Sequence, residues 1–225
     1  MSRATDLARA SARQRLAGLS GAVLLGGASS RMGRDKAALA VAGVAGATRI
    51  ALALDALCDE VLLVGGTPPA DAKGRAVTDP EGPRCALRGL VAALEAARGE
   101  RVLVVATDLP LLTDAFLRGL AAAAAADADA DAVVPRPVPK AQPLCAVYRR
   151  LPVLARARER LAAGELALHG LLDTLRVTWI EGERLRALDP AGTALLNVNT
   201  PEDLVRAEAL LRSQAARPGA DAARD

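Results

Sequence analysis

Aromatic residues are almost missing from this sequence of 225 residues, which contains one Trp, one Tyr and one Phe. Its core must therefore be built from Leu, Val and Ala, and apolar residues make up 52% of the chain, enough for a sizeable core. Proteins that bind nucleic acid gather basic residues on one face, and those that bind single strands stack bases on aromatic side chains. With so few aromatic residues and a net charge of +3, a nucleic-acid partner is not expected.

Cysteines and long apolar runs are also scarce. The three cysteines, Cys58, Cys85 and Cys145, are odd in number and far apart, which excludes an evident disulfide framework or cysteine metal motif. This usage predicts a reducing, cytoplasmic compartment. No apolar run approaches the ~18 residues of a membrane span, and the N-terminal residues lack the apolar segment of a secretory signal. Neither a membrane nor secretion is expected.

Apolar strands and amphipathic helices alternate along the chain. Strands are expected at 22–25, 60–64, 101–106, 132–135, 142–150 and 176–180, and helices at 48–57, 87–97, 113–126, 151–163 and 201–211. The contiguous apolar residues of 101–106 are typical of a parallel strand covered on both faces. We therefore predict a three-layer α/β domain over residues 21–212, with a mostly parallel sheet and helices on both faces. An extension (1–20) precedes it and a disordered tail (213–225) follows.

The stretch AVLLGGASSRMGRDKAAL, residues 22–39, places glycine, hydroxyl and cationic residues directly after a buried strand. In open α/β sheets, ligands bind beyond the carboxyl ends of strands, where glycine lets successive N–H groups point at an anion. Arg31 and Lys36 can neutralise phosphate charge, and Ser29 and Ser30 add donors. The spacing fits neither a P-loop nor a G-x-G-x-x-G loop. The alternative is a tight turn that carries a solvated Arg and Lys.

Asp108, in VLVVATDLPLLT, follows the buried strand 101–106 by two residues. It therefore belongs at the same sheet edge as the glycine-rich stretch. A carboxylate there can hold Mg²⁺, which keeps most of its waters and needs only one or two protein carboxylates. The alternative is a carboxylate that caps a turn before Pro110.

A third polar segment, LLNVNTPEDL, lies near the C-terminus. Its Thr200, Pro201 and Asp203 have the pattern of a helix start: a cap, a proline in the first position and an acidic residue in the third. That pattern leaves Asn197 and Asn199 unexplained. Their amide oxygens could complete a Mg²⁺ shell or hold a phosphate through water.

The loop LLGGASSRMGRDKAAL resembles the signature L-A-[GA]-G-x-S-x-R-M-G-x-x-K of a family of nucleotidyltransferases. Its paired glycine and its RMG-x-D-K ending are most similar to the molybdenum cofactor guanylyltransferases. TDLP and NVNTPEDL follow in the family's order, so the resemblance spans residues 21 to about 210. The chain departs from the family where GVAGATRI replaces a Gly-x-Pro-Leu turn, and where GPRCALRG replaces G-P-L-x-G.

The resemblance implies Mg²⁺-dependent transfer of GMP from GTP to the terminal phosphate of a molybdopterin-type acceptor, with release of pyrophosphate. It implies three catalytic residues: Arg31, Lys36 and Asp108. It implies a nucleotide-binding set of Leu25, Gly26, Gly27, Ser29, Gly33, Lys36 and Asp79, and metal ligands Asp108 and Asn199, with Asn197 close to them. It also places Gln142 and Pro143 on the acceptor side, and makes molybdoenzymes or cofactor-handling proteins possible partners.

Several alternatives stay open at this point. Another transferase of the same fold could act on CTP or on a sugar phosphate. A non-catalytic nucleotide-binding module would keep the glycine-rich loop but would not need Asp108, and a Rossmann oxidoreductase would need the missing G-x-G-x-x-G. Lys140 and Arg149 could meet an acceptor phosphate or be solvated. His169, the only histidine, is expected on a helix surface or at a C-terminal cap, with no catalytic role.

Overall fold

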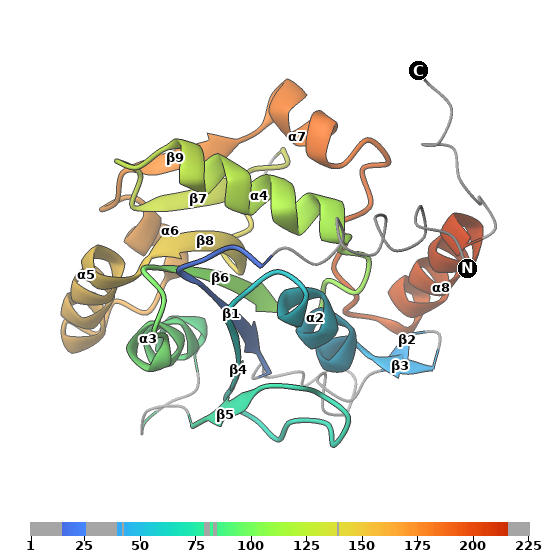
Figure 1. The fold of residues 1–225 in the computed structure, drawn as a ribbon, viewed down its shortest axis with the longest axis horizontal. Helices are drawn as coiled ribbons and strands as arrows, with labels where there is room; N and C mark the ends of the chain where they lie inside the picture. The colour runs from blue at the N-terminus through green and yellow to red at the C-terminus, as the bar shows by residue number, and fades with distance from the viewer. Residues whose placement is uncertain are drawn as a thin grey trace, which may run out of the picture.

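The fold is built on a seven-stranded sheet in the order β5-β4-β1-β6-β8-β7-β9 (Figure 1). The computed structural model describes residues 15–25, 40–41, 43–78, 82, 85–138 and 140–215. The strands of the sheet are β1 (Leu19–Leu24), β4 (Glu60–Val64), β5 (Arg75–Val77), β6 (Arg101–Ala106), β7 (Ala132–Pro135), β8 (Cys145–Arg149) and β9 (Val177–Ile180). A separate antiparallel hairpin is formed by β2 (Ala40–Val41) and β3 (Val44–Ala45).

Most neighbouring strands of the sheet are parallel. β1 runs parallel to β4 and β6, β4 to β5, and β7 to β9, whereas β8 is antiparallel to both β6 and β7. A parallel return needs a crossover of about a dozen residues or more, usually with a helix. The Pro-rich connection 136–144 is too short for one, so β8 turns back beside β7. The predicted mostly parallel α/β sheet is confirmed, with this one antiparallel strand.

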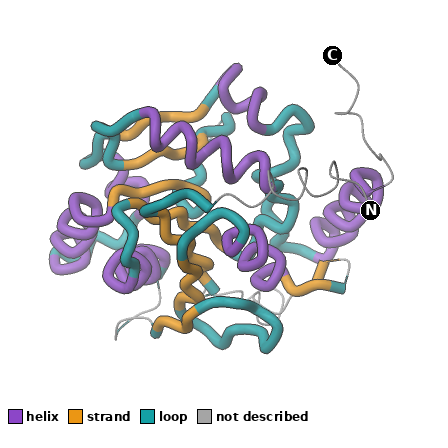
Figure 2. The backbone as a smooth tube through the Cα atoms, viewed as in Figure 1, coloured by secondary structure: helices purple, strands orange, loops and turns teal. Residues whose placement is uncertain are grey.

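Helices cover both faces of the sheet (Figures 1 and 2). The helices are α2 (Gly46–Asp55), α3 (Ala86–Ala96), α4 (Asp114–Ala126), α5 (Arg150–Ala162), α6 (Leu168–Leu172), α7 (Gly182–Leu188) and α8 (Pro201–Ala215). α2 and α4 pack on one face, and α3, α5 and α6 on the other. Alternate residues of β1 enter opposite cores: Val23 lies with α2 and α4, and Leu24 with α3 and α5. The cores contain mostly Leu, Val and Ala, as the composition predicts.

Most predicted elements are observed within two residues of their predicted bounds, whereas β2, β3, β5, α6 and α7 are not among the predicted ranges. The strands predicted at 60–64, 101–106 and 132–135 are observed with those bounds. β1 begins at Leu19, inside the predicted extension 1–20, because Ser20 already pairs with Glu60 and Val102. β8 begins at Cys145 rather than at 142, because the Cys145 N–H closes a turn onto the Gln142 carbonyl (3.0 Å). α8 continues to Ala215, past the predicted boundary at 212. The division into one domain and two terminal segments stays a prediction.

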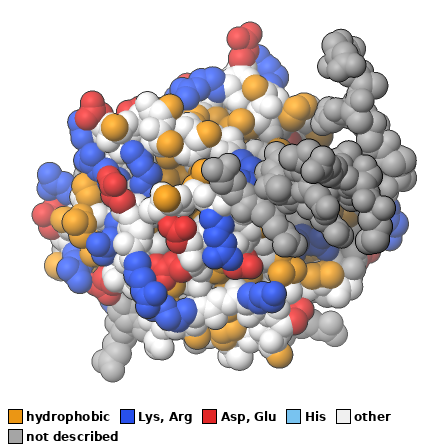
Figure 3. All heavy atoms as spheres, viewed as in Figure 1, with side chains coloured by type: hydrophobic (Ala, Val, Ile, Leu, Met, Phe, Trp, Pro, Cys, Tyr) orange, Lys and Arg blue, Asp and Glu red, His pale blue; other side chains and the backbone are white. Residues whose placement is uncertain are grey.

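The surface and the cysteines also agree with the composition. On the face shown in Figure 3, Lys and Arg lie among Asp, Glu and apolar side chains, without one continuous basic stripe. Cys58, Cys85 and Cys145 are free, and the first and last of them are buried. Within the described ranges, no helix is long and apolar enough to cross a membrane.

Candidate active site

The carboxyl ends of β1 and β6 lie side by side at one edge of the sheet. Leu24, the last residue of β1, is in register with Ala106, the last residue of β6. Leu25 follows directly, is 2% exposed, and donates its N–H to the Val64 carbonyl (2.9 Å). The glycine-rich loop therefore leaves the sheet next to the segment that carries Asp108. The strands that lead into these two segments therefore end at the same edge of the sheet, and the position of the loop itself stays a prediction.

Most of the predicted nucleotide-binding loop lies outside the described residues. This applies to Gly26, Gly27, Ser29, Arg31, Gly33 and Lys36, and also to Asp79 after β5. Their roles stay predictions. Leu25 is the member of that set whose position the structure gives.

Asp108 is tied to the Asn-Val-Asn segment through the backbone. The N–H of Val198 donates to the carbonyl of Asp108 (2.8 Å). Val198 is also buried in a small apolar cluster with Val41, Leu111 and Ala207, which joins β2, the segment after Asp108 and helix α8. This cluster holds residues 197–199 against the Asp108 segment, although the two are far apart in the sequence.

The start of α8 fixes the other end of the Asn-Val-Asn segment. The Asp203 carboxylate accepts the backbone N–H groups of Asn199 and Thr200 (both 2.9 Å), and the Asp203 N–H donates to the Thr200 hydroxyl (3.1 Å). The predicted helix start is confirmed. The N–H of Asn199 contributes most to lowering the pKa of Asp203, which is further lowered by Thr200. The same carboxylate thus caps α8 and positions Asn199.

This cap predicts a loss of stability in acid. Because folding lowers the pKa of Asp203, its stabilising effect is complete above the unfolded value of about 3.9 and is lost as pH falls through the lower folded value. In thermal unfolding measured from pH 7 to pH 2, the melting temperature of Asp203→Asn should therefore be lower than that of the wild type at neutral pH. The difference between the two melting temperatures should disappear below about pH 4. Glu202→Gln, which removes a charge from the same turn, is the control. A gap that stays constant down to pH 2 would contradict the assignment.

Asp108 and Asn197 face one cavity of about 310 Å³ at this edge of the sheet. Asp108 is half-buried and Asn197 is exposed. The remaining lining residues are mostly apolar: Ala86, Leu109, Ala141, Gln142, Pro143, Leu144, Leu166, Leu168 and His169. Gln142 and Pro143, predicted for the acceptor side, thus lie in the same cavity as Asp108. The resemblance gives the role of metal ligand to Asn199 and places Asn197 only close by. In the structure, Asn197 is the asparagine that lines the cavity.

One wall of this cavity is fixed by buried hydrogen bonds. The hydroxyl of Tyr148, 0% exposed, donates to the carbonyl of Pro143 (2.6 Å). The N–H of Ala106 donates to the carbonyl of Leu144 (2.8 Å), and the N–H of Gln142 to that of Pro135 (2.9 Å). The segment 142–144 is therefore preorganised, and binding a ligand against it costs little ordering.

Cys145 lies beneath this wall and is not a nucleophile. Its burial, and then the negative charge of Asp108, raise the pKa of its thiol. The thiol is therefore neutral at physiological pH, and a neutral thiol is a weak nucleophile. Cys145 is a small core residue, as the sequence predicts.

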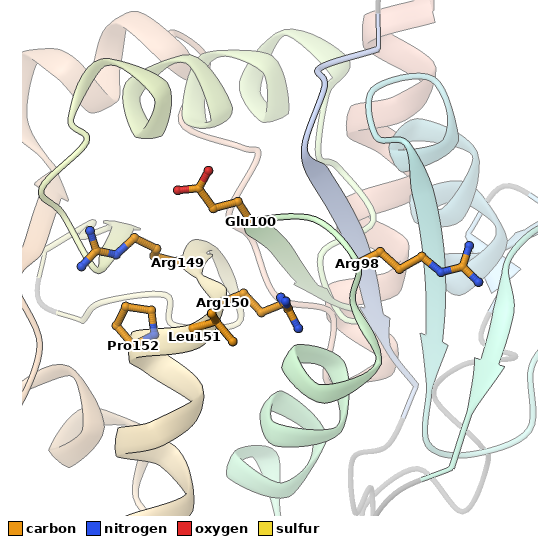
Figure 4. A pocket seen from close by; sticks show the side chains of 6 residues that line it. All are labelled: Arg98, Glu100, Arg149, Arg150, Leu151 and Pro152. Atoms are coloured by element: carbon orange, nitrogen blue, oxygen red, sulfur yellow. The ribbon is translucent and has the colours of Figure 1, made fainter.

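A second cavity, of about 410 Å³, lies at the opposite edge of the sheet (Figure 4). It is lined by Arg98, Glu100, Arg149, Arg150, Leu151 and Pro152. Their charged ends point in different directions and do not converge on one ligand position (Figure 4). Arg149 binds Asp131 (2.8 Å) there, in register with Arg101 at the start of β6. The suggestion that Arg149 could meet an acceptor phosphate is therefore wrong, because β8 runs antiparallel and carries Arg149 away from Asp108.

Comparisons with known proteins give the family of the chain. Residues 21–175 match the MobA-like NTP transferase domain. A probable molybdenum cofactor guanylyltransferase of Chloroflexus aggregans is 36% identical over 203 residues, which cover 86% of this chain and 95% of the relative. The molybdenum cofactor guanylyltransferase of Desulfosudis oleivorans is 33% identical over 200 residues, which cover 87% of this chain and 96% of the relative.

Solved structures show the same fold. Molybdopterin-guanine dinucleotide biosynthesis protein A from Archaeoglobus fulgidus superposes with a TM-score of 0.73 at 23% identity, covering 86% of this chain and 99% of its own. 2-C-methyl-D-erythritol 4-phosphate cytidylyltransferase from Thermus thermophilus superposes with a TM-score of 0.64 at 22% identity, covering 85% and 98%. At these identities the superpositions establish the shared architecture.

Proposed function

Because this chain belongs to the MobA-like NTP transferase family, we propose that it transfers GMP from GTP to the terminal phosphate of molybdenum-molybdopterin and releases pyrophosphate. The observation that carries the proposal is the position of Asp108. It stands beside the exit of the glycine-rich loop and faces a cavity that also contains Asn197 and Gln142. The similarity to two molybdenum cofactor guanylyltransferases, over 86% and 87% of this chain, supports the donor and the acceptor.

The order of the strands supports different binding positions for the nucleotide and the acceptor. β1 leads into the glycine-rich loop and β5 into the segment with Asp79, and both strands lie in the half of the sheet formed by β5, β4 and β1. We assign the nucleotide to that half. The cavity lies against the segment that leads into β8 and against α6. We assign the acceptor to the cavity, so that Asp108 stands where the two substrates meet.

In this arrangement the chain works by positioning and charge neutralisation. The terminal phosphate of the acceptor attacks the α-phosphorus of GTP in line, and pyrophosphate leaves. N–H groups of the loop 26–33 hold the β- and γ-phosphates, while Arg31 and Lys36 neutralise charge on the α-phosphate and the leaving group. No covalent intermediate with the enzyme is needed, in agreement with the neutral thiol of Cys145.

The residues at this edge fit a divalent cation such as Mg²⁺. The carboxylate of Asp108 and the amide of Asn197 face one cavity, and oxygen ligands of these types suit Mg²⁺. Three or more His, Cys, Asp or Glu side chains do not gather anywhere in the described ranges, but Mg²⁺ needs only one or two carboxylates. We propose that Asp108 and Asn199 hold the ion, with Asn197 close by. When bound, it would neutralise negative charge on the nucleotide oxygens.

Nucleotide binding tests this proposal directly. Calorimetry with Mg²⁺ and GTP, CTP, ATP or UTP should show selective binding of GTP, which is weakened in Asp108→Ala. The protein should then convert GTP and molybdenum-molybdopterin to the guanine dinucleotide and pyrophosphate. A preference for CTP would overturn the assignment of the donor. The absence of any transfer, with the acceptor supplied, would overturn the activity.

We also propose that the protein works in a reducing, cytoplasmic compartment and passes its product to a molybdoenzyme or a cofactor-handling protein. The free state of its cysteines supports the first part. A labile product that must reach an apoenzyme supports the second. Co-purification of the protein with a molybdoenzyme, compared between cells with and without molybdate, would test this transfer.

A further inference from the structure

The scarcity of rings in this chain singles out His169. The sequence contains one Trp, one Tyr, one Phe and one His. Phe116 and Tyr148 are both 0% exposed in the two cores, so neither can contact a ligand. Trp179 lies on β9 at the far end of the sheet, with its ring under the Arg136 guanidinium, 4.4 Å away. His169 is therefore the single planar ring that the chain can offer at the cavity of Asp108.

His169 is held at this cavity by its helix. It lies in the first turn of α6 and is exposed, as predicted for a helix surface, and that surface lines the cavity. Its neighbours Leu168 and Leu171 are 9% and 0% exposed, and they anchor α6 in the core under α5. Within the described part of the chain, the imidazole makes no hydrogen bond, ion pair or ring contact. The anchored helix thus presents to the cavity a ring that has no partner among the described residues.

The rest of the cavity suits a flat heterocycle that carries a phosphate. Leu144, Leu166 and Leu168 give it an apolar wall, and Leu166 remains 40% exposed although it is a large apolar residue. Asp108 and Asn197 give it a polar end. A planar ring can lie along the apolar wall while its phosphate reaches the polar end, where the Asn197 amide can donate to it and a cation held by Asp108 would offset the carboxylate charge.

We propose that the imidazole of His169 stacks on the heterocycle of the acceptor and is a specificity-determining residue for it. The identity of the acceptor as a pterin rests on the proposed function, whereas the stacking contact rests on the cavity alone. Planar heterocycles stack on imidazole rings as they do on other aromatic side chains. Because His169 lies on the acceptor side of Asp108, its removal should affect the acceptor and leave the nucleotide unaffected.

Three variants separate stacking from a general effect on α6. His169→Ala removes the ring, and His169→Phe keeps a ring without its nitrogens. Asp173→Ala changes the exposed C-cap residue directly after the same helix and is the control. Each protein is titrated, without GTP, with a fluorescent pterin that carries a phosphate monoester. We expect binding about 10-fold or more weaker in His169→Ala, close to wild type in His169→Phe, and unchanged in Asp173→Ala.

Steady-state kinetics with GTP and molybdenum-molybdopterin complete the test. The KM for the acceptor should rise in His169→Ala by about the same factor, with the KM for GTP unchanged. Wild-type affinity for the pterin in His169→Ala would overturn the stacking contact and leave the proposed function standing. Failure of the wild type to transfer GMP would overturn the proposed function, and the pterin titration would still decide the role of His169. No pterin binding by the wild type would overturn the inference.

Discussion

Replacing Asp108 by alanine is expected to lower the turnover of GTP with molybdenum-molybdopterin about 1,000-fold, because charge stabilisation at a transferred phosphoryl group supplies several kcal/mol. The carboxylate is half-buried at the edge where β1 and β6 end together, and it faces the cavity that we assign to the acceptor. The hydrogen bond from Val198 goes to the Asp108 main-chain carbonyl, which alanine retains. The variant should therefore keep the contact between its main chain and residue 198 and remain folded, which a thermal melt checks.

Two further variants make this result specific. Asp108→Asn keeps the shape and removes the negative charge, so it should be nearly as slow as Asp108→Ala. Asp114→Ala removes an exposed carboxylate in the first turn of α4 that forms an ion pair with Arg118 on the same helix, and it should keep full turnover. The measurement is the rate of pyrophosphate release at saturating GTP and acceptor, over a range of Mg²⁺ concentrations. An Asp108→Ala protein that turns over at the wild-type rate would end the assignment of Asp108 as a metal ligand.

Replacing Gly99 by alanine is expected to destabilise the fold by about 3 kcal/mol, the upper part of the range for overpacking a tight site. A Cβ at Gly99 would stand 2.5 Å from the Gly18 carbonyl oxygen and 2.9 Å from the Ser20 backbone nitrogen. Both atoms belong to the main chain at the start of β1, which cannot move without breaking its pairing with β4 and β6. The strain therefore cannot be relieved by rotating a side chain.

The same substitution would disturb a buried polar network. The N–H of Gly99 donates to the Ser20 hydroxyl (2.9 Å), which donates to the Glu60 carboxylate (2.8 Å). Ser20 is 1% exposed, so a displaced hydroxyl would lose its partners without gaining water. Burial raises the pKa of Glu60, but hydrogen bonds from the Arg98 N–H, Ser20 and Arg75 lower it overall, so this carboxylate is a charged acceptor in the network.

Thermal and urea unfolding measure this effect. For a chain of this size, about 3 kcal/mol corresponds to a melting temperature roughly 6–12 °C lower. Gly18→Ala is the control, because Gly18 has a φ of +77° and nothing within 4 Å of its would-be Cβ. That control should lose only about 1 kcal/mol, the cost of a left-handed alanine. Equal losses in the two variants would show that the contact of Gly99 with β1 is not the cause.

Local patterns account for the elements that the sequence predicts correctly. The contiguous apolar residues of 60–64 and 101–106 give strands with those bounds, because a strand buried on both faces needs no polar alternation. Thr113 caps α4 by accepting the Phe116 N–H (3.1 Å), and Gly164, with a φ of +75°, follows the end of α5. These features depend on residues within one turn or one strand, so their information is contained in a short window of sequence.

Contacts between residues far apart in the sequence could not be predicted from such short windows. A helix start at 200–203 predicts nothing about which strand end lies against it, and Val41, Leu111 and Val198 look like ordinary apolar residues until they meet in one cluster. The short connection before β8 reverses that strand, which sends Arg149 to one edge of the sheet and leaves Gln142 at the other. The direction of a strand follows from the length of the connection before it and from the strands that are available to pair with it. The sequence pattern of the strand itself encodes neither of these.

The sequence by itself determined the α/β class, the strands that bury the core, the glycine-rich loop and the two segments that carry Asp108 and Asn199, because each is written in neighbouring residues. Only the tertiary structure decided that Asn197 shares a cavity with Asp108, that Arg149 lies at the opposite edge, and that His169 is the aromatic ring that lines the cavity of Asp108. The physical reason is that the order and direction of the strands bring these residues together or separate them. That order is set by packing both faces of one sheet at once, which involves the whole chain.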